Sequence, residues 1–126
     1  MRGQIVLVVD DWPDQLVLMQ RILAPLDVDT LMAADGAEAL ALLRAHPVAL
    51  VIADRQMPRV DGEELVAQMR RDPELAAIPV IIVSGSPQWP DDAPAPDLLL
   101  AKPLDADEVR EHVQRLLGLG STGDAE

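Results

Sequence analysis

Five short apolar runs rich in β-branched residues alternate with segments of helical periodicity along this 126-residue chain. The runs cover residues 5–9, 28–32, 48–53, 80–83 and, more weakly, 98–101. Strands this uniformly apolar are typical of parallel sheets whose two faces are both covered by helices. The alternation therefore predicts one α/β domain built from parallel strand and helix units.

Helices are expected over residues 13–24, 36–45, 62–71 and 105–117. Pro13 suits a first helical turn, and three aspartates each precede a glutamate by three residues, the spacing of a capping box. These aspartates are Asp35, Asp61 and Asp105. Residues 87–96, where a crossover helix would normally lie, contain four prolines. Because proline inside a helix removes a hydrogen bond and clashes with the preceding turn, this fourth helix should be shortened or irregular.

Composition and charge exclude several classes of function. The absence of cysteine rules out disulfides, thiol catalysis and thiolate metal sites. A formal net charge of −12 and the lack of a basic patch argue against direct binding to nucleic acid. The first apolar run is too short for a signal peptide or a membrane span. A cytoplasmic protein without membrane contact is therefore expected.

Polar residues gather where the predicted strands end. Asp10 and Asp11 follow the first strand, Asp54 the third, Ser84 the fourth and Lys102, the only lysine, the fifth. The carboxyl ends of parallel strands share one edge, and ligands bind there at the point where strand order reverses. If the first and third strands are neighbours, three carboxylates converge, and Mg²⁺ is a natural counter-charge. Asp54 would then be a nucleophile able to form an aspartyl phosphate.

Each of these residues also has a purely structural explanation. Asp10 or Asp11 alone could cap the first helix, Ser84 alone could be a turn residue, and Lys102 alone could be a solvated surface charge. Asp54 is harder to explain, since an acid that ends an apolar strand needs a reason to be there. The joint placement of five such residues at the ends of four strands favours a site.

Four motifs in the chain resemble the receiver domain of two-component response regulators. They cover residues 5–11, 54–62, 80–84 and 102–104, within a resemblance that extends over residues 4–117. The resemblance implies a flavodoxin-like (βα)5 fold, a doubly wound parallel sheet with strand order 2-1-3-4-5. A stand-alone receiver domain is expected over residues 1–118, and the small, polar residues 119–126 are expected to form a disordered tail.

The resemblance further implies a role for each residue of the site. Asp54 would be the phosphoacceptor. Mg²⁺, which Mn²⁺ could replace, would be held by Asp10 acting mainly through water, Asp11, Asp54 and the main-chain carbonyl of Gln56. Ser84 and Lys102 would bind the phosphoryl group, and the peptide bond before Pro103 would be cis. The family's aromatic switch residue, three positions before the lysine, is replaced here by Leu99, so a non-standard output is expected.

The implied function is that of a phosphoacceptor signalling protein rather than an enzyme with a separate substrate. A histidine kinase or histidine phosphotransfer protein would donate the phosphoryl group, docking on the first helix around residues 16–20. An unidentified protein would receive the signal, and activation could bring two copies together as a homodimer. The alternative is a receiver-fold binding module that signals without phosphorylation. An aspartate-nucleophile phosphatase is disfavoured because its Asp-x-Asp signature is absent at Trp12 and Pro13.

Overall fold

The five strands form one parallel sheet in the order β2-β1-β3-β4-β5, which confirms the predicted doubly wound fold. The computed structural model describes residues 3–86 and 88–119. The strands are β1 (Gln4–Val9), β2 (Val28–Ala33), β3 (Val48–Asp54), β4 (Val80–Ser84) and β5 (Leu98–Ala101). The helices are α1 (Pro13–Leu23), α2 (Gly36–Ala45), α3 (Gly62–Arg71) and α4 (Ala106–Leu117).

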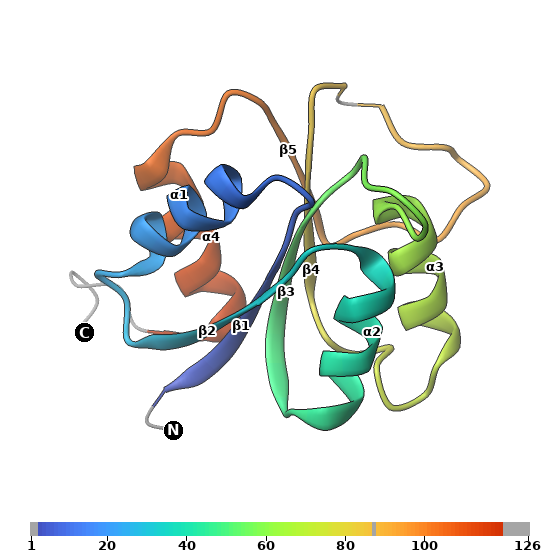
Figure 1. Cartoon of the computed structure of the whole chain (residues 1–126), viewed down its shortest axis with the longest axis horizontal. Helices are drawn as coiled ribbons and strands as arrows, with labels where there is room; N and C mark the ends of the chain where they lie inside the picture. The colour runs from blue at the N-terminus through green and yellow to red at the C-terminus, as the bar shows by residue number, and fades with distance from the viewer. Residues whose placement is uncertain (1–2, 87, 120–126) are drawn as a thin grey trace.

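Two helices cover each face of the sheet, α1 and α4 on one side and α2 and α3 on the other (Figure 1). Alternate residues of β1 fill the two cores: Val6 and Val8 pack in the cluster of α1 and α4, and Leu7 and Val9 in the cluster of α2 and α3. Successive side chains of a strand point to opposite faces. A strand buried on both sides therefore has to be apolar throughout, as the sequence of β1 is.

The helix starts follow the predicted capping pattern. A carboxylate oxygen of Asp35 accepts a hydrogen bond from the Glu38 N–H at 2.8 Å. The corresponding bonds of the two later helices, from Glu64 N–H to Asp61 and from Glu108 N–H to Asp105, are 2.9 and 3.0 Å long. Each cap satisfies one of the free N–H groups in a first helical turn.

The connection between β4 and β5 contains no helix among residues 85–86 and 88–97, so the expected irregularity is confirmed. We call residues 88–97 the strap. In Figure 1 it is the orange arc beside α3. Its Trp89 packs against the core of α2 and α3, and the indole Nε1 donates to the Pro94 carbonyl at 3.0 Å. At the other end, Arg70 of α3 donates to Asp97 at 2.6 Å.

The last helix ends at Gly118, which adopts the left-handed conformation with a φ of 71°. The following Leu119 N–H donates to the Gln114 carbonyl at 2.9 Å, and Leu119 packs against the core of α1 and α4. The remainder of the predicted tail, residues 120–126, lies outside the described residues. Within the described part of the chain, no helix is both long enough and apolar enough to cross a membrane.

Gly62, the first residue of α3, lies against the end of β3. Its N–H donates to the Arg55 carbonyl at 2.8 Å, and an added Cβ would come within 2.8 Å of the Arg55 Cα and the Asp54 carbonyl oxygen. These contacts are with backbone atoms, which cannot move aside as a flexible side chain can. A glycine is therefore required for α3 to begin this close to Asp54.

We expect Gly62→Ala to lower the free energy of unfolding by roughly 1–3 kcal/mol, because overpacking displaces the backbone. Urea denaturation measures the change. Gly85→Ala is the matched control, since a Cβ there meets nothing within 4 Å. Its effect should stay within about 0.5 kcal/mol. Equal losses in the two variants would contradict the close approach at Gly62.

Candidate functional site

Three aspartates converge at the carboxyl edge of the sheet. Asp10 and Asp11 come directly after β1, and Asp54 is the last residue of β3. One carboxylate oxygen of each lies within 4.8 Å of the others. β1 and β3 are hydrogen-bonded neighbours, and the strand order reverses between them. The point where ligands bind in doubly wound sheets is therefore the point where the three acids meet.

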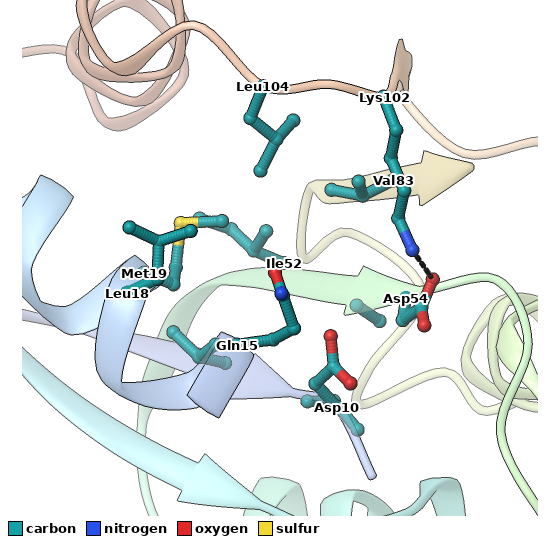
Figure 2. Close-up of a pocket in the computed structure, with 12 residues that line it drawn as sticks. Asp10, Gln15, Leu18, Met19, Ile52, Asp54, Val83, Lys102 and Leu104 are labelled. Carbon is teal, nitrogen blue, oxygen red and sulfur yellow. Dashed lines mark ion pairs between the residues drawn. The ribbon is translucent and has the colours of Figure 1, made fainter. Parts of the chain in front are cut away.

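Lys102 supplies a positive charge at the same place. It follows β5, and its Nζ lies 3.1 Å from Oδ1 of Asp54 (Figure 2). The Asp54 side chain is only 12% exposed, whereas that of Lys102 is 44% exposed. The Lys102 N–H also donates to the Ser84 carbonyl at 2.9 Å, and the peptide bond between Lys102 and Pro103 is cis. The lysine backbone is thus fixed beside β4 while its side chain reaches over the carboxylates.

The environment of Asp10 disfavours the ionised form of its carboxyl group. Partial burial raises the pKa of its carboxyl group, and the neighbouring charges of Asp54 and Asp11 raise it further. The Trp12 N–H, which donates to Asp10 at 2.9 Å, and the charge of Lys102 both act in the opposite direction. The net result is a raised pKa for Asp10, so its ionised form is destabilised by partial burial first and by the neighbouring carboxylates second.

A second group of residues borders the other side of Asp54. Ser84, buried at the end of β4, accepts a hydrogen bond at its Oγ from the Ser86 N–H at 3.0 Å. Ser84, Ser86 and Asp54 line the same open pocket, which has a volume of about 470 Å³. It is lined by Asp54, Arg55, Gln56, Glu63, Ser84, Gly85, Ser86, Gln88 and Lys102. The pocket gathers the predicted Ser84, Gln56 and Lys102 around Asp54.

Arg55 and Glu63 also line this pocket, and sequence reasoning assigned them no role. Arg55 lies in the second motif, directly after Asp54, and Glu63 lies within the helix expected over residues 62–71. Their side chains form an ion pair with a shortest distance of 2.7 Å. Nothing in the spacing of the two residues predicts this contact, because it depends on how α3 begins beside β3.

The apolar surroundings differ on the two sides of the sheet. Leu99, at the position of the altered aromatic switch, packs half-buried against the core of α2 and α3. On the other side, Gln15 and Leu18 of α1 line a small cavity beside Asp10 and Asp54 (Figure 2). Leu18 and its neighbour Val17 are 45% and 44% exposed. An exposed apolar stretch of α1 therefore lies next to the acidic cluster.

A doubly wound sheet that gathers three carboxylates and a lysine at its switch point defines a receiver-type domain. The family model for the response regulator receiver domain matches residues 6–114. Because this match covers most of the chain, the chain belongs to the response regulator receiver domain family. Domains of this family are the signalling phosphoacceptors of two-component systems, not enzymes in the usual sense.

Curated relatives include a protein of similar length and much longer ones. The chain is 31% identical to the protein PilH of Pseudomonas aeruginosa, covering 89% of this chain and 96% of PilH. It is 35% identical to the sensor histidine kinase TmoS of Ectopseudomonas mendocina, covering 95% of this chain but 13% of TmoS. It spans 50% of the response regulator Rre1 of Synechocystis at 34% identity. The chain therefore spans half or less of several relatives that it matches.

Solved structures agree with this assignment. The receiver domain of a signal transduction histidine kinase from Syntrophus aciditrophicus superposes with a TM-score of 0.83 at 26% identity, covering 98% of this chain and 97% of that one. The chemotaxis protein CheY4 of Vibrio cholerae superposes with a TM-score of 0.82 at 26% identity, covering 91% of this chain and 99% of CheY4. The receiver domain of the sensor histidine kinase PA1611 from Pseudomonas aeruginosa was crystallised with magnesium in its active-site cleft. It superposes with a TM-score of 0.83, covering 92% of this chain and 98% of that one. At 23% identity it shows a shared fold alone.

We expect Asp10→Asn to stabilise the protein in buffer that contains EDTA. Because the pKa of Asp10 is raised, the native state binds more protons than the unfolded state at pH values between the ordinary pKa of 3.8 and the higher pKa of the folded protein. Stability is therefore lost as pH rises through that window. The asparagine keeps an oxygen for the Trp12 N–H but removes the charge. Urea denaturation at pH 7 should give a higher free energy of unfolding than in wild type, with the difference shrinking toward pH 3.8.

Asp14→Asn is the control for that comparison. Asp14 lies in the first turn of α1, where a negative charge interacts favourably with the helix dipole, and it is outside the cluster. Its removal should not stabilise the protein. An Asp10→Asn protein no more stable than wild type at pH 7 would contradict the raised pKa of Asp10.

Proposed function

We propose that this chain accepts a phosphoryl group on Asp54 with the assistance of Mg²⁺. The observation that carries the proposal is the arrangement around Asp54. Its carboxylate lies 3.1 Å from the Lys102 ammonium and within 4.8 Å of the carboxylates of Asp10 and Asp11. One nucleophile, one cation and two further acids thus meet at the edge of the sheet.

The donor set of this cluster fits Mg²⁺. The candidate ligands are all oxygen atoms, which hard cations prefer, and three carboxylates lie together with one neighbouring ammonium group. Mg²⁺ usually binds one or two carboxylates directly and keeps several waters. We assign Asp11, Asp54 and the Gln56 carbonyl as direct ligands, with Asp10 acting through water. Mn²⁺ prefers similar oxygen ligands and could replace Mg²⁺.

Asp54, Lys102 and Ser84 would each have a separate role in phosphoryl transfer. A carboxylate oxygen of Asp54 attacks phosphorus, the bond from phosphorus to the donor nitrogen breaks, and its electron pair leaves with the imidazole, which takes up a proton. The bound cation would supply charge neutralisation at the phosphoryl oxygens. Lys102, already at Asp54, would pair with those oxygens, and the buried Ser84 hydroxyl would donate a hydrogen bond to them.

The phosphodonor would be a histidine kinase or a histidine phosphotransfer protein that docks on α1. The exposed apolar side chains of Val17 and Leu18 lie on this helix, and Trp12, just before it, is 63% exposed. An apolar surface beside a charged pocket suits a partner that must bring its own reactive residue to Asp54. We infer that α1 contributes to partner choice and that the pocket carries out the transfer.

We expect wild type, incubated with acetyl phosphate and Mg²⁺, to gain about 80 Da by intact mass, the mass of one phosphoryl group. Asp54→Asn should show no gain, because it lacks the nucleophile, and EDTA should abolish the gain of wild type. Asp11→Asn should reduce it, whereas Asp14→Asn, outside the cluster, should match wild type. A folded, Mg²⁺-binding protein that gains no mass from acetyl phosphate or from a panel of kinases would instead favour a binding module that works without phosphorylation.

A second experiment tests the docking surface. Leu18→Ala should slow transfer from a phosphorylated kinase by about tenfold, because it truncates an apolar anchor of the interface. The rate with acetyl phosphate, which needs no docking, should stay unchanged. Met32→Ala is the matched control, since Met32 is a similarly exposed apolar residue on β2. Equal transfer rates for wild type and Leu18→Ala would place the docking surface elsewhere.

A further inference from the structure

Arg55 joins the end of the phosphoacceptor strand to two other parts of the fold. Its Nε and Nη2 donate to one oxygen of Glu63 at 3.0 and 2.7 Å. Its Nη1 donates to the main-chain carbonyls of Gln88 and, at 3.4 Å, Ser86. The guanidinium carbon lies 4.8 Å from the centre of the Trp89 ring, within the range of a cation–π interaction. One side chain therefore connects α3 with the strap.

The main chain of Arg55 is fixed, so any response of this residue has to come from its side chain. The Arg55 N–H donates to the Val83 carbonyl of β4 at 2.9 Å, and its carbonyl accepts from the Gly62 N–H at 2.8 Å. The side chain is 16% exposed, so most of its surface is covered by the contacts with Glu63 and the strap. A competing partner for the guanidinium would have to break these contacts.

Two arginines hold the strap, and they differ in their relation to the site. Arg70 fixes the end near β5 through Asp97 and, at 3.4 Å, the Ala95 carbonyl. Arg55 fixes the end near β4 through Gln88 and Trp89. Arg55 lines the same pocket as Asp54, whereas Arg70 is not among the residues that line it. Of the two arginines, only Arg55 therefore links the strap to the pocket that contains Asp54.

Phosphorylation would place a strong competitor for the guanidinium in that pocket. A phosphoryl group carries a charge of about −1.5 to −2 and three acceptor oxygens. The planar fork of arginine pairs with two phosphate oxygens at once. In the present structure both donors of that fork share a single oxygen of Glu63. The phosphoryl group therefore offers the guanidinium separate acceptor oxygens for its two donors, whereas Glu63 offers a single one.

We propose that Arg55 couples the phosphorylation state of Asp54 to the conformation of the strap. When Asp54 is phosphorylated, the Arg55 guanidinium leaves Glu63, the Gln88 carbonyl and the Trp89 ring for the phosphoryl oxygens, and this end of the strap loosens. The coupling rests on the proposed function of Asp54. The coupling also makes Trp89 an aromatic residue whose environment changes with phosphorylation. The usual switch position is Leu99, and the chain has no Phe or Tyr and only one other tryptophan, Trp12.

Trp89 can be followed directly because the chain contains two tryptophans. In a Trp12→Phe protein, the emission comes from Trp89 alone. Intact mass and acrylamide quenching are measured on the same sample before and after incubation with acetyl phosphate and Mg²⁺. We expect the quenching constant of Trp89 to rise by a factor of about two in the phosphorylated protein, as local opening of the strap exposes the ring.

Arg55→Met in the same background separates coupling from a general loosening of the protein. Its Trp89 should already be more accessible before phosphorylation, and phosphorylation should add no further change. Arg70→Met is the matched control, because it releases the other end of the strap. Its Trp89 should still respond to phosphorylation. If Arg55→Met does not fold, Arg55→Lys takes its place, since lysine keeps the charge but lacks the planar fork.

The mass reading separates failure of the coupling from failure of the proposed function. A phosphorylated protein with unchanged Trp89 quenching would overturn the coupling and leave Asp54 as the phosphoacceptor. The coupling would also be overturned if phosphorylation raised Trp89 quenching in Arg55→Met as strongly as in the parent protein. A folded protein that gains no phosphoryl mass from acetyl phosphate or from a panel of kinases would overturn the proposed function, and the coupling with it.

Discussion

Pairing of β1 with β3 holds three carboxylates within 4.8 Å of one another. Neither strand can shift to relieve the repulsion, because Val6 and Leu50 are buried in one core while Leu7 and Val51 are buried in the other. Any movement of the strand ends would disturb close-packed side chains on both faces. Hydrophobic burial along the sheet thus stabilises a charged edge that would be unfavourable by itself, and it leaves that edge ready for a cation.

Two cationic side chains line the pocket that contains Asp54, and their chemistry differs. Lys102 carries a point charge on a flexible stem that is 44% exposed, so it can follow the acidic group as charge moves outward onto a phosphoryl group. Arg55 carries a planar charge that is already engaged on several sides. Phosphorylation of Asp54 would therefore require only a local movement of the Lys102 side chain. Arg55 would have to give up its contacts with the strap, because one guanidinium cannot bind both the phosphoryl group and the strap.

Local patterns in the sequence were sufficient for the strands and the helix starts, whereas the strand order that brings the acids together was implied by the resemblance to receiver domains. Apolar runs define buried strands, Asp35, Asp61 and Asp105 define helix starts, and parallel topology brings strand ends to one edge. The contacts of Arg55 with Glu63 and Trp89 could not be predicted, since they join three segments whose relative placement no periodicity encodes. The prolines of the strap indicated that a helix would be disrupted, but they carried no information about what would take its place.

The replacement of a helix by the strap changes what keeps this connection ordered. A helix satisfies its backbone carbonyls internally, so its order depends mainly on its own residues. In the strap, the carbonyls of Gln88, Ala95 and Pro94 accept instead from side chains: Arg55, Arg70 and the indole of Trp89. A connection built in this way holds its shape only while those side chains keep their positions. One of them belongs to the residue that follows Asp54, so the order of the strap is tied to the electrostatics of the site.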